Sequence, residues 1–225
     1  MQMADIDIQC IIFDLDDTLV ESEPIWANAY AKLYEALGQE FYWKDLLKYL
    51  GMTILDVSRD VHSLFKVTQY TVEECADMLR KFLLEGFDGN IKLMPGVSEF
   101  LQKVNGCYKM SIASGSPREA IERTIKAKGW EKIFTSYVSS EEVEHGKPEP
   151  DVFLEAAHRL GCKPEYSLVI EDGVKGVMAA KDAGMTAFYV KNSPDPEAVS
   201  RADRYFHSMK DIQPFDLQKI ENNSI

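Results

Sequence analysis

Cysteine is scarce in this sequence, and the four cysteines lie far apart with no CxxC pair among them: Cys10, Cys75, Cys107 and Cys162. Scattered cysteines indicate reduced thiols that act as small apolar side chains in a cytoplasmic protein, and they do not favour a disulfide framework or a zinc site. The N-terminal segment MQMADIDIQ has neither the basic start nor the apolar stretch of a signal peptide, and no apolar run approaches the length of a membrane span. We therefore expect a cytoplasmic protein without a membrane segment.

Basic residues are also few. The 225 residues include 25 Lys and Arg against 37 Asp and Glu, which gives a formal net charge of −12. A surface that binds nucleic acid or an anionic membrane needs a basic stripe, so neither partner is expected. A small anionic substrate is not excluded, because a few lysines in a pocket can override the field of the whole protein. The sequence cannot give the oligomeric state, and a monomer is the default expectation.

The chain is organised around an apolar run, Ile8 to Phe13, that ends in three carboxylates: Asp14, Asp16 and Asp17. Unpaired carboxylates are costly in an apolar setting, so these acids should lie just past the carboxyl end of a buried strand, where open α/β sheets bind ligands. Acids crowded together repel one another unless a cation neutralises them. The stretch therefore suggests a magnesium site with an aspartate placed for chemistry. The alternative is a strand followed by a plain acidic turn.

The rest of the chain divides into a helical block and an alternating block. The first block has a helical pattern with turn residues at 86–90, and its expected helices are 25–37, 43–50, 54–65 and 72–84. In the second block helices alternate with strands, and the strands are expected at 109–113, 136–139, 167–170, 186–190 and near 205–206. Such alternation predicts an α/β fold, in which helices cover both faces of a parallel sheet.

The helical block is too long to be a simple crossover. A βαβ unit needs only about 30 residues, whereas about 100 residues separate Asp14 from Ser114. We expect the surplus to form an inserted helical cap domain at residues 21–92, with a Rossmann-like α/β core domain made of residues 1–20 and 93–225. Both linkers lie close to the acidic loop, so the insertion can close over it as a lid.

Polar residues recur at the carboxyl ends of the expected strands, and these ends share one edge of a parallel sheet. Glu171 and Asp172 follow a later strand, and with Asp14 they offer the hard oxygen ligands that suit Mg²⁺. Ser114 and the backbone amide of Gly115 can donate to phosphate oxygens at a turn into a helix. Lys147, in the loop GKPEPD, supplies positive charge that can pair with Asp14 and with a phosphoryl group.

Four segments carry a family resemblance: DLDDTLVESEP, IASGS, GKPEPD and IEDGVKGVMAAKDAGM. They closely resemble, in this order, the motifs of the haloacid dehalogenase superfamily, specifically its β-phosphoglucomutase-like phosphatase branch. The resemblance covers residues 8–20 and 93–210, and four ordered motifs are far more specific than one. It implies a Rossmann-like core with a helical cap, and a Mg²⁺-dependent phosphatase that acts on a small phosphorylated metabolite such as a sugar or polyol phosphate.

The resemblance also implies a role for each motif residue. Asp14 would attack phosphorus and form an aspartyl phosphate, while Asp16 would protonate the leaving alcohol and then activate water. Ser114 and Lys147 would hold the phosphoryl oxygens, and Lys147 would also orient Asp14. Asp16 argues against dehalogenation, because the dehalogenase branch lacks an acid/base aspartate at this position.

The resemblance implies that the metal is held by the carboxylates of Asp14, Glu171 and Asp172 and by the backbone carbonyl of Asp16. The metal would offset the repulsion between an anionic nucleophile and an anionic phosphate. Fixed donors and Mg²⁺ would then stabilise the charge on the equatorial oxygens of the transition state.

Two departures from the pattern lie in the expected cap, and a third lies beside the nucleophile. Mutases of the branch carry a histidine where Trp26 stands, and a Lys-Gly…Arg signature where this chain has Leu50, Gly51 and Met52. A mutase must hold a second phosphate, so the missing cations favour hydrolysis, with a sugar-phosphate mutase as the alternative. Trp26, Gly51 and Met52 are the candidate cap contacts with substrate. The family usually has glycine where Asp17 stands.

A third hypothesis is non-enzymatic. The domain could be a phospho-acceptor or binding module, in which Asp14 is only a phosphorylation mark or a metal ligand. Asp16 and the long cap speak against it, because a passive acceptor needs neither.

Overall fold

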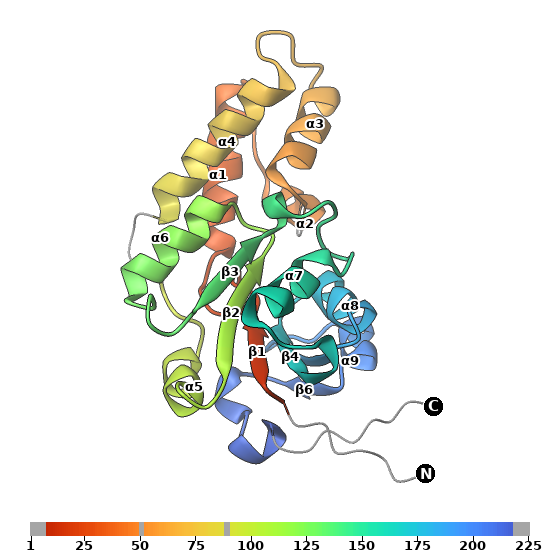
Figure 1. Cartoon of the computed structure of the whole chain (residues 1–225). Helices are drawn as coiled ribbons and strands as arrows, with labels where there is room; N and C mark the ends of the chain where they lie inside the picture. The colour runs from red at the N-terminus through yellow and green to blue at the C-terminus, as the bar shows by residue number, and fades with distance from the viewer. Residues whose placement is uncertain (1–7, 50–51, 88–90, 218–225) are drawn as a thin grey trace.

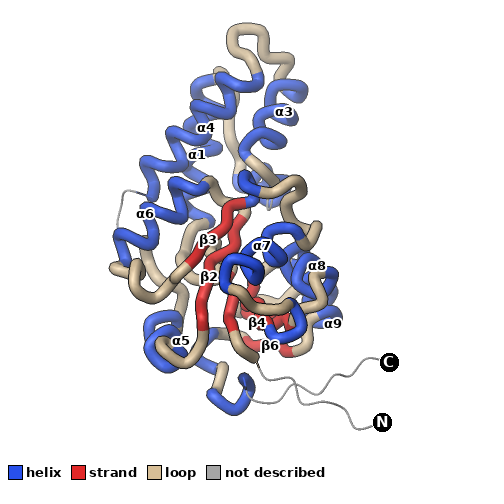
Figure 2. The backbone as a smooth tube through the Cα atoms, in the orientation of Figure 1, coloured by secondary structure: helices blue, strands red, loops and turns tan. Residues whose placement is uncertain are grey.

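The computed structural model describes residues 8–49, 52–87 and 91–217, and these contain a six-stranded sheet in the order β3-β2-β1-β4-β5-β6 (Figure 2). Every neighbouring pair of strands is parallel. The predicted α/β class with a Rossmann-like sheet is confirmed. The strands are β1 (Cys10–Phe13), β2 (Lys109–Ser114), β3 (Ser136–Ser139), β4 (Ser167–Glu171), β5 (Thr186–Val190) and β6 (Arg204–Phe206).

All four residues of strand β1 are buried, and successive side chains point to opposite sides of the sheet. Ile11 and Phe13 join one hydrophobic cluster, and Cys10 and Ile12 join another. Helices from the alternating block bury these two faces. The first face is covered by α5 (Val97–Val104) and α6 (Arg118–Lys128), and the second by α7 (Asp151–Leu160), α8 (Val174–Asp182) and α9 (Pro196–Arg201).

The register of the sheet brings three chain segments to one edge. Phe13 lies opposite Ile112 of β2 and opposite Ile170 of β4. The backbone amide of Asp14 continues this pairing by donating to the carbonyl of Ile170 at 3.0 Å. The polar residues that end these three strands are therefore neighbours, as the strand-end pattern predicts.

Four helices form the elongated part of the molecule beyond that edge of the sheet (Figure 1). They are α1 (Glu23–Ala36), α2 (Trp43–Tyr49), α3 (Ile54–Leu64) and α4 (Val72–Phe87). Helix α4 packs against α1 and α3, and also touches α6 of the alternating block. The division into a core of residues 1–20 and 93–225 and a cap of residues 21–92 stays a prediction.

The expected break at residues 86–90 is wrong at its start, because α4 continues through Gly86 to Phe87. A Cβ at Gly86 would lie 2.4 Å from a methyl carbon of Ile25, so glycine here permits the close approach of α1 and α4. Residues 88–90 lie outside the described residues. The sequence patterns also missed single turns of 3-10 helix at Ser140–Glu142, Pro164–Tyr166, Met209–Asp211 and Pro214–Leu217.

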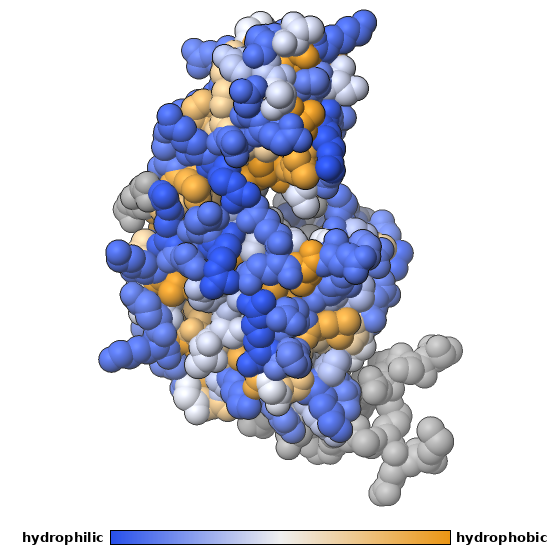
Figure 3. Space-filling model, turned by 45° about the horizontal axis from the view of Figure 1, so that its top comes forward, coloured by the Kyte–Doolittle hydropathy of each residue, from blue (hydrophilic) through white to orange (hydrophobic). Residues whose placement is uncertain are grey.

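The molecular face in Figure 3 is mostly hydrophilic, and its apolar side chains form small separate patches. Among the described residues, no helix combines the length and apolarity that crossing a membrane requires. The expected cytoplasmic location and monomeric state stay predictions.

Candidate active site

Buried carboxylates and a lysine meet where β1 and β4 end. The Nζ atom of Lys147 donates to Asp14 Oδ1 at 2.6 Å and to Glu171 Oε1 at 2.8 Å, and all three side chains are at most one tenth exposed. Asp172 completes the group, since one carboxylate oxygen from each of Asp14, Glu171 and Asp172 lies within 4.8 Å of the others. Asp14, Lys147, Glu171 and Asp172 thus come together at one edge of the sheet, as the sequence predicts.

The electrostatics of this group are those of a site short of positive charge. Burial raises the pKa of Asp14 well above its ordinary value, although Lys147 opposes the shift. Burial and then the charge of Glu171 raise the pKa of Asp172 to about 7, against the pull of Lys191. Burial acts to lower the pKa of Lys147, but the charges of Asp14 and Glu171 outweigh it and the pKa is raised, so Lys147 stays charged.

Two further residues hold Asp172. Lys191 donates from Nζ to Oδ2 of Asp172 at 2.7 Å, and the hydroxyl of Thr18 lies 3.4 Å from Oδ1. Sequence reasoning missed Lys191, although it directly follows β5 and the strand-end argument applies to it. The ionic cluster is hereafter the set Asp14, Lys147, Glu171, Asp172 and Lys191.

Glu171 fits only because a glycine faces it. Its Oε2 atom accepts from the amide of Gly173 at 2.6 Å. A Cβ on Gly176 would lie 1.6 Å from Glu171 Oε1, so any other residue there would displace the carboxylate. Gly176 lies within the fourth motif, but nothing in its spacing pointed to this contact.

Asp16 lies in a different environment, in which uncharged groups hold its carboxylate. Oδ2 accepts from Ser114 Oγ at 2.9 Å and from Ser116 Oγ at 2.7 Å, while Oδ1 accepts from the indole nitrogen of Trp26 at 3.0 Å. Ser114 is the last residue of β2, Ser116 lies in the loop that follows it, and Trp26 comes from α1. These four residues are hereafter the neutral-donor cluster. Ser116 was not among the predicted site residues.

Asp17 has a structural contact rather than a place in either cluster. Its backbone is left-handed, with φ 54°, and its Oδ1 atom accepts from the amides of Ser22 at 2.9 Å and Glu23 at 3.2 Å. These amides begin α1, where the first turn lacks intrahelical partners. Ser22 is the N-cap residue of α1, but its own side chain makes no capping hydrogen bond, and Asp17 provides the side-chain acceptor.

The remaining predicted residues are less informative. Gly115 is exposed between the buried Ser114 and Ser116, which leaves its backbone accessible. Met52 is half-buried and packs against the large hydrophobic cluster. Gly51 lies outside the described residues.

A sequence model of the family described as haloacid dehalogenase-like hydrolase matches residues 11–190 of the chain. A bifunctional riboflavin kinase/FMN phosphatase from Arabidopsis thaliana is 32% identical over 211 residues, which cover 91% of this chain and 54% of that protein. The chain thus spans about half the length of the Arabidopsis protein. A phosphorylated carbohydrates phosphatase from Thermotoga maritima is 32% identical over 192 residues, which cover 81% of this chain and 84% of that protein.

Solved structures share the fold. A β-phosphoglucomutase from Clostridium difficile superimposes with a TM-score of 0.82 over 94% of this chain and 96% of its own. Its sequence is 21% identical, so this likeness concerns the fold alone.

Proposed function

The chain belongs to the haloacid dehalogenase-like hydrolase family, and from this premise we propose that it is a phosphatase of small phosphorylated metabolites, with sugar or polyol phosphates as the first class to test. The observation that carries the proposal is the double contact of Lys147 with Asp14 and Glu171. A buried cation that touches both a potential nucleophile and a potential metal ligand is suited to holding a phosphoryl group between them. The phosphatase activity of the Thermotoga relative supports the same class.

The residues of the ionic cluster fit a magnesium ion. Three carboxylates face two lysines in this cluster, Lys147 beside Asp14 and Glu171 and Lys191 beside Asp172, so a further cation would reduce their repulsion, and carboxylate oxygens are the donors that Mg²⁺ prefers. Asp14, Glu171 and Asp172 would hold the ion, together with the backbone carbonyl of Asp16. When bound, Mg²⁺ would supply charge neutralisation between the nucleophile and the phosphate.

In the first half-reaction, a carboxylate oxygen of Asp14 attacks the phosphorus. The bond between phosphorus and the ester oxygen breaks, and Asp16 gives its proton to that oxygen, so the alcohol leaves neutral. Lys147, Ser114 and the amide of Gly115 donate to the phosphoryl oxygens. Lys147 already orients Asp14 at 2.6 Å.

In the second half-reaction, water attacks the phosphorus of the aspartyl phosphate. Asp16, now a carboxylate, takes a proton from that water, and the bond between phosphorus and the Asp14 oxygen breaks. Inorganic phosphate leaves, and Asp14 and Asp16 return to their starting states. One aspartate therefore acts as nucleophile and the other as acid and base.

The helices between residues 21 and 92 act as a cap in this proposal. Trp26 of α1 bonds to Asp16, so at least one cap residue reaches the reacting groups. Closure would exclude bulk water and select the leaving group, as lids generally do. The mutase and phospho-acceptor alternatives have no specific observation in their favour among the described residues.

The test is a screen of phosphorylated sugars and polyols in the presence of Mg²⁺, with inorganic phosphate as the readout. Asp14→Asn should abolish turnover without unfolding the chain, while Asp182→Asn, at the exposed end of α8, should retain it. Full turnover by Asp14→Asn under metal-replete conditions would refute the nucleophile. Isomerised sugar phosphate without released phosphate would instead indicate the mutase.

A further inference from the structure

We propose that Ser116 is a positioning residue that holds the Asp16 carboxylate for proton transfer, and that Glu142 anchors Ser116 through Ser139. The inference rests on the proposed function and extends it to three residues with no assigned role. Its starting observation is the shortest contact of Asp16, the 2.7 Å hydrogen bond from the hydroxyl of Ser116, which is 1% exposed.

Ser116 differs from the other serine that contacts Asp16. Ser114 also donates to Oδ2, but the proposed function assigns its hydroxyl to the phosphoryl oxygens during the reaction. A hydroxyl has a single proton to donate, so Ser114 cannot serve both acceptors at once. When phosphate is bound, Ser116 is the serine that continues to hold Asp16.

The backbone of Ser116 is itself held from a neighbouring strand. Its carbonyl accepts a hydrogen bond from the hydroxyl of Ser139, at the end of β3, at 2.7 Å, and its amide donates to Ser114 Oγ at 2.9 Å. Ser139 is fully buried. The loop after β2, which carries the hydroxyl that donates to Asp16, is thus fastened to β3.

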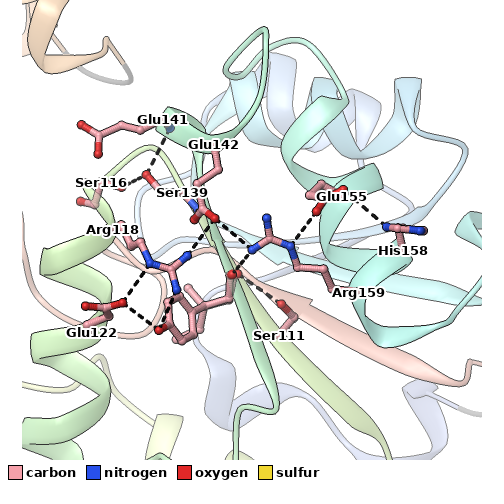
Figure 4. A network of polar contacts seen from close by, with 12 residues as sticks. Ser111, Ser116, Arg118, Glu122, Ser139, Glu141, Glu142, Glu155, His158 and Arg159 are labelled. Carbon is pink, nitrogen blue, oxygen red and sulfur yellow. Dashed lines mark hydrogen bonds and ion pairs between the residues drawn. The ribbon is translucent and has the colours of Figure 1, made fainter.

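Glu142 fixes Ser139 in turn. Its Oε1 atom accepts from the amide of Ser139 at 3.0 Å, which together with the bond from the Glu141 amide to Ser139 Oγ closes the turn after β3. Figure 4 shows that Glu142 lies between two guanidinium groups. Its Oε2 atom accepts from Arg118 at 2.8 Å and from Arg159 at 3.1 Å.

The two arginines tie Glu142 to the helices on either side of β3. Arg118 begins α6 and Arg159 lies in the last turn of α7. An unbroken series of hydrogen bonds therefore runs from Asp16 through Ser116 and Ser139 to Glu142. Ser139 makes both links, since its hydroxyl donates to the Ser116 carbonyl and its amide donates to Glu142, so loosening Glu142 would loosen the position of Ser116.

The first experiment separates positioning of the acid from general damage. It measures kcat/KM for two esters: the sugar or polyol phosphate that the wild type hydrolyses best, and 4-nitrophenyl phosphate. An alcohol needs a proton in order to leave, whereas 4-nitrophenolate does not. Ser116→Ala should lower kcat/KM about tenfold for the first ester and less than about twofold for the second. Ser58→Ala, which removes a buried hydroxyl from α3, should not change the ratio of the two values.

Glu142→Ala should change the same ratio in the same direction, by about threefold, because it acts through two hydrogen bonds. Glu155→Ala is its matched control. Glu155 accepts from Arg159 at 2.6 Å but has no bond to Ser139, so its removal should leave the ratio unchanged. An equal loss on both esters for Ser116→Ala, or no loss on either, would overturn the proposal.

A second measurement does not depend on turnover. Wild type, Ser116→Ala, Asp16→Asn and the double variant are unfolded in urea, and the shifts in midpoint are compared. Non-additive shifts support the contact between Ser116 and Asp16, and additive shifts contradict it. If the wild type releases phosphate from no ester, the proposed function and the proton-transfer role fail, while the unfolding comparison still decides whether Ser116 holds Asp16.

Discussion

Asp14 and Asp16 stand two residues apart in one loop, yet the structure surrounds them with opposite kinds of partner. Asp14 belongs to the ionic cluster and contacts the ammonium group of Lys147. Asp16 belongs to the neutral-donor cluster, where two hydroxyls and an indole hold it. An ion pair keeps a carboxylate charged and fixed, as a nucleophile requires. Neutral donors let a proton arrive or leave without breaking an ion pair, as an acid and base requires.

The largest effect is expected from removing the cation of the ionic cluster. Lys147→Met leaves Asp14 and Glu171 buried without their partner, and breaking a buried pair in this way costs about 3–5 kcal/mol. We expect that loss in the free energy of urea unfolding with a chelator present, together with at least a ~10³-fold loss of kcat. Lys163→Met removes an exposed lysine instead and should change neither value. A free energy of unfolding equal to that of wild type would show that the contacts of Lys147 with Asp14 and Glu171 do not stabilise the fold.

The sequence predicted the ionic cluster better than the neutral-donor cluster, and the reason is topological. Asp14, Glu171 and Asp172 lie at the carboxyl ends of strands, so a parallel sheet brings them to one edge whatever their rotamers are. Trp26 and Ser116 reach Asp16 through the direction of a helix and the bend of a loop, which neither motif nor periodicity encodes. Trp26 was expected to contact substrate, and its observed partner is a residue of the loop after β1.

Contacts that depend on a glycine or on an unusual backbone conformation were also not predicted from the sequence. The need for Gly176 becomes visible only when the Glu171 carboxylate is placed beside it. Asp17 looked like a third acid of the site, but its positive φ turns its side chain to the start of α1. The sheet and most of the helix positions followed from the apolar pattern, whereas these contacts depend on side-chain geometry.

Gly176→Ala is expected to have a smaller effect, also on the ionic cluster. The added Cβ would overlap Glu171, so the carboxylate must move away from Lys147, at a cost of about 1–3 kcal/mol typical of overpacking. Mg²⁺ should then raise the unfolding temperature less than it does in wild type. Adding Glu171→Ala removes the overlap and should recover part of the lost stability. Equal loss in the double variant would place the strain elsewhere.

Trp26→Phe tests the neutral-donor cluster. It removes the donor of a 3.0 Å bond to Asp16 while leaving a ring to pack near Tyr30, whose ring centroid lies 5.7 Å away. A hydrogen bond to a carboxylate is worth about 1.5–3 kcal/mol, so kcat/KM for an alkyl phosphate should fall about ten- to 150-fold. Stability should fall by no more than the value of this bond, and Mg²⁺ binding should stay near wild type, in contrast to the ionic-cluster variants. Trp43→Phe, at an exposed tryptophan of α2, is the control.

The smallest effect concerns the pH dependence of stability in the metal-free chain. The pKa of Asp172 is raised to about 7, above its ordinary unfolded value near ~4, so the folded state binds more protons than the unfolded state between these pH values. The contribution of Asp172 to stability is therefore lost as the pH rises through this window. Asp172→Asn removes the titrating group, so its free energy of unfolding should lack that loss.

With a chelator present, the unfolding free energy of wild type minus that of Asp172→Asn should fall by about 1 kcal/mol between roughly pH 6.3 and pH 8. Asp182→Asn, at an exposed position, should show no such trend relative to wild type. A difference that stays constant, or that grows with pH, would mean that Lys191 already neutralises Asp172 fully at 2.7 Å. In that case the charge of Asp172 would be balanced by Lys191, and the need of the ionic cluster for a metal ion would rest on Asp14 and Glu171.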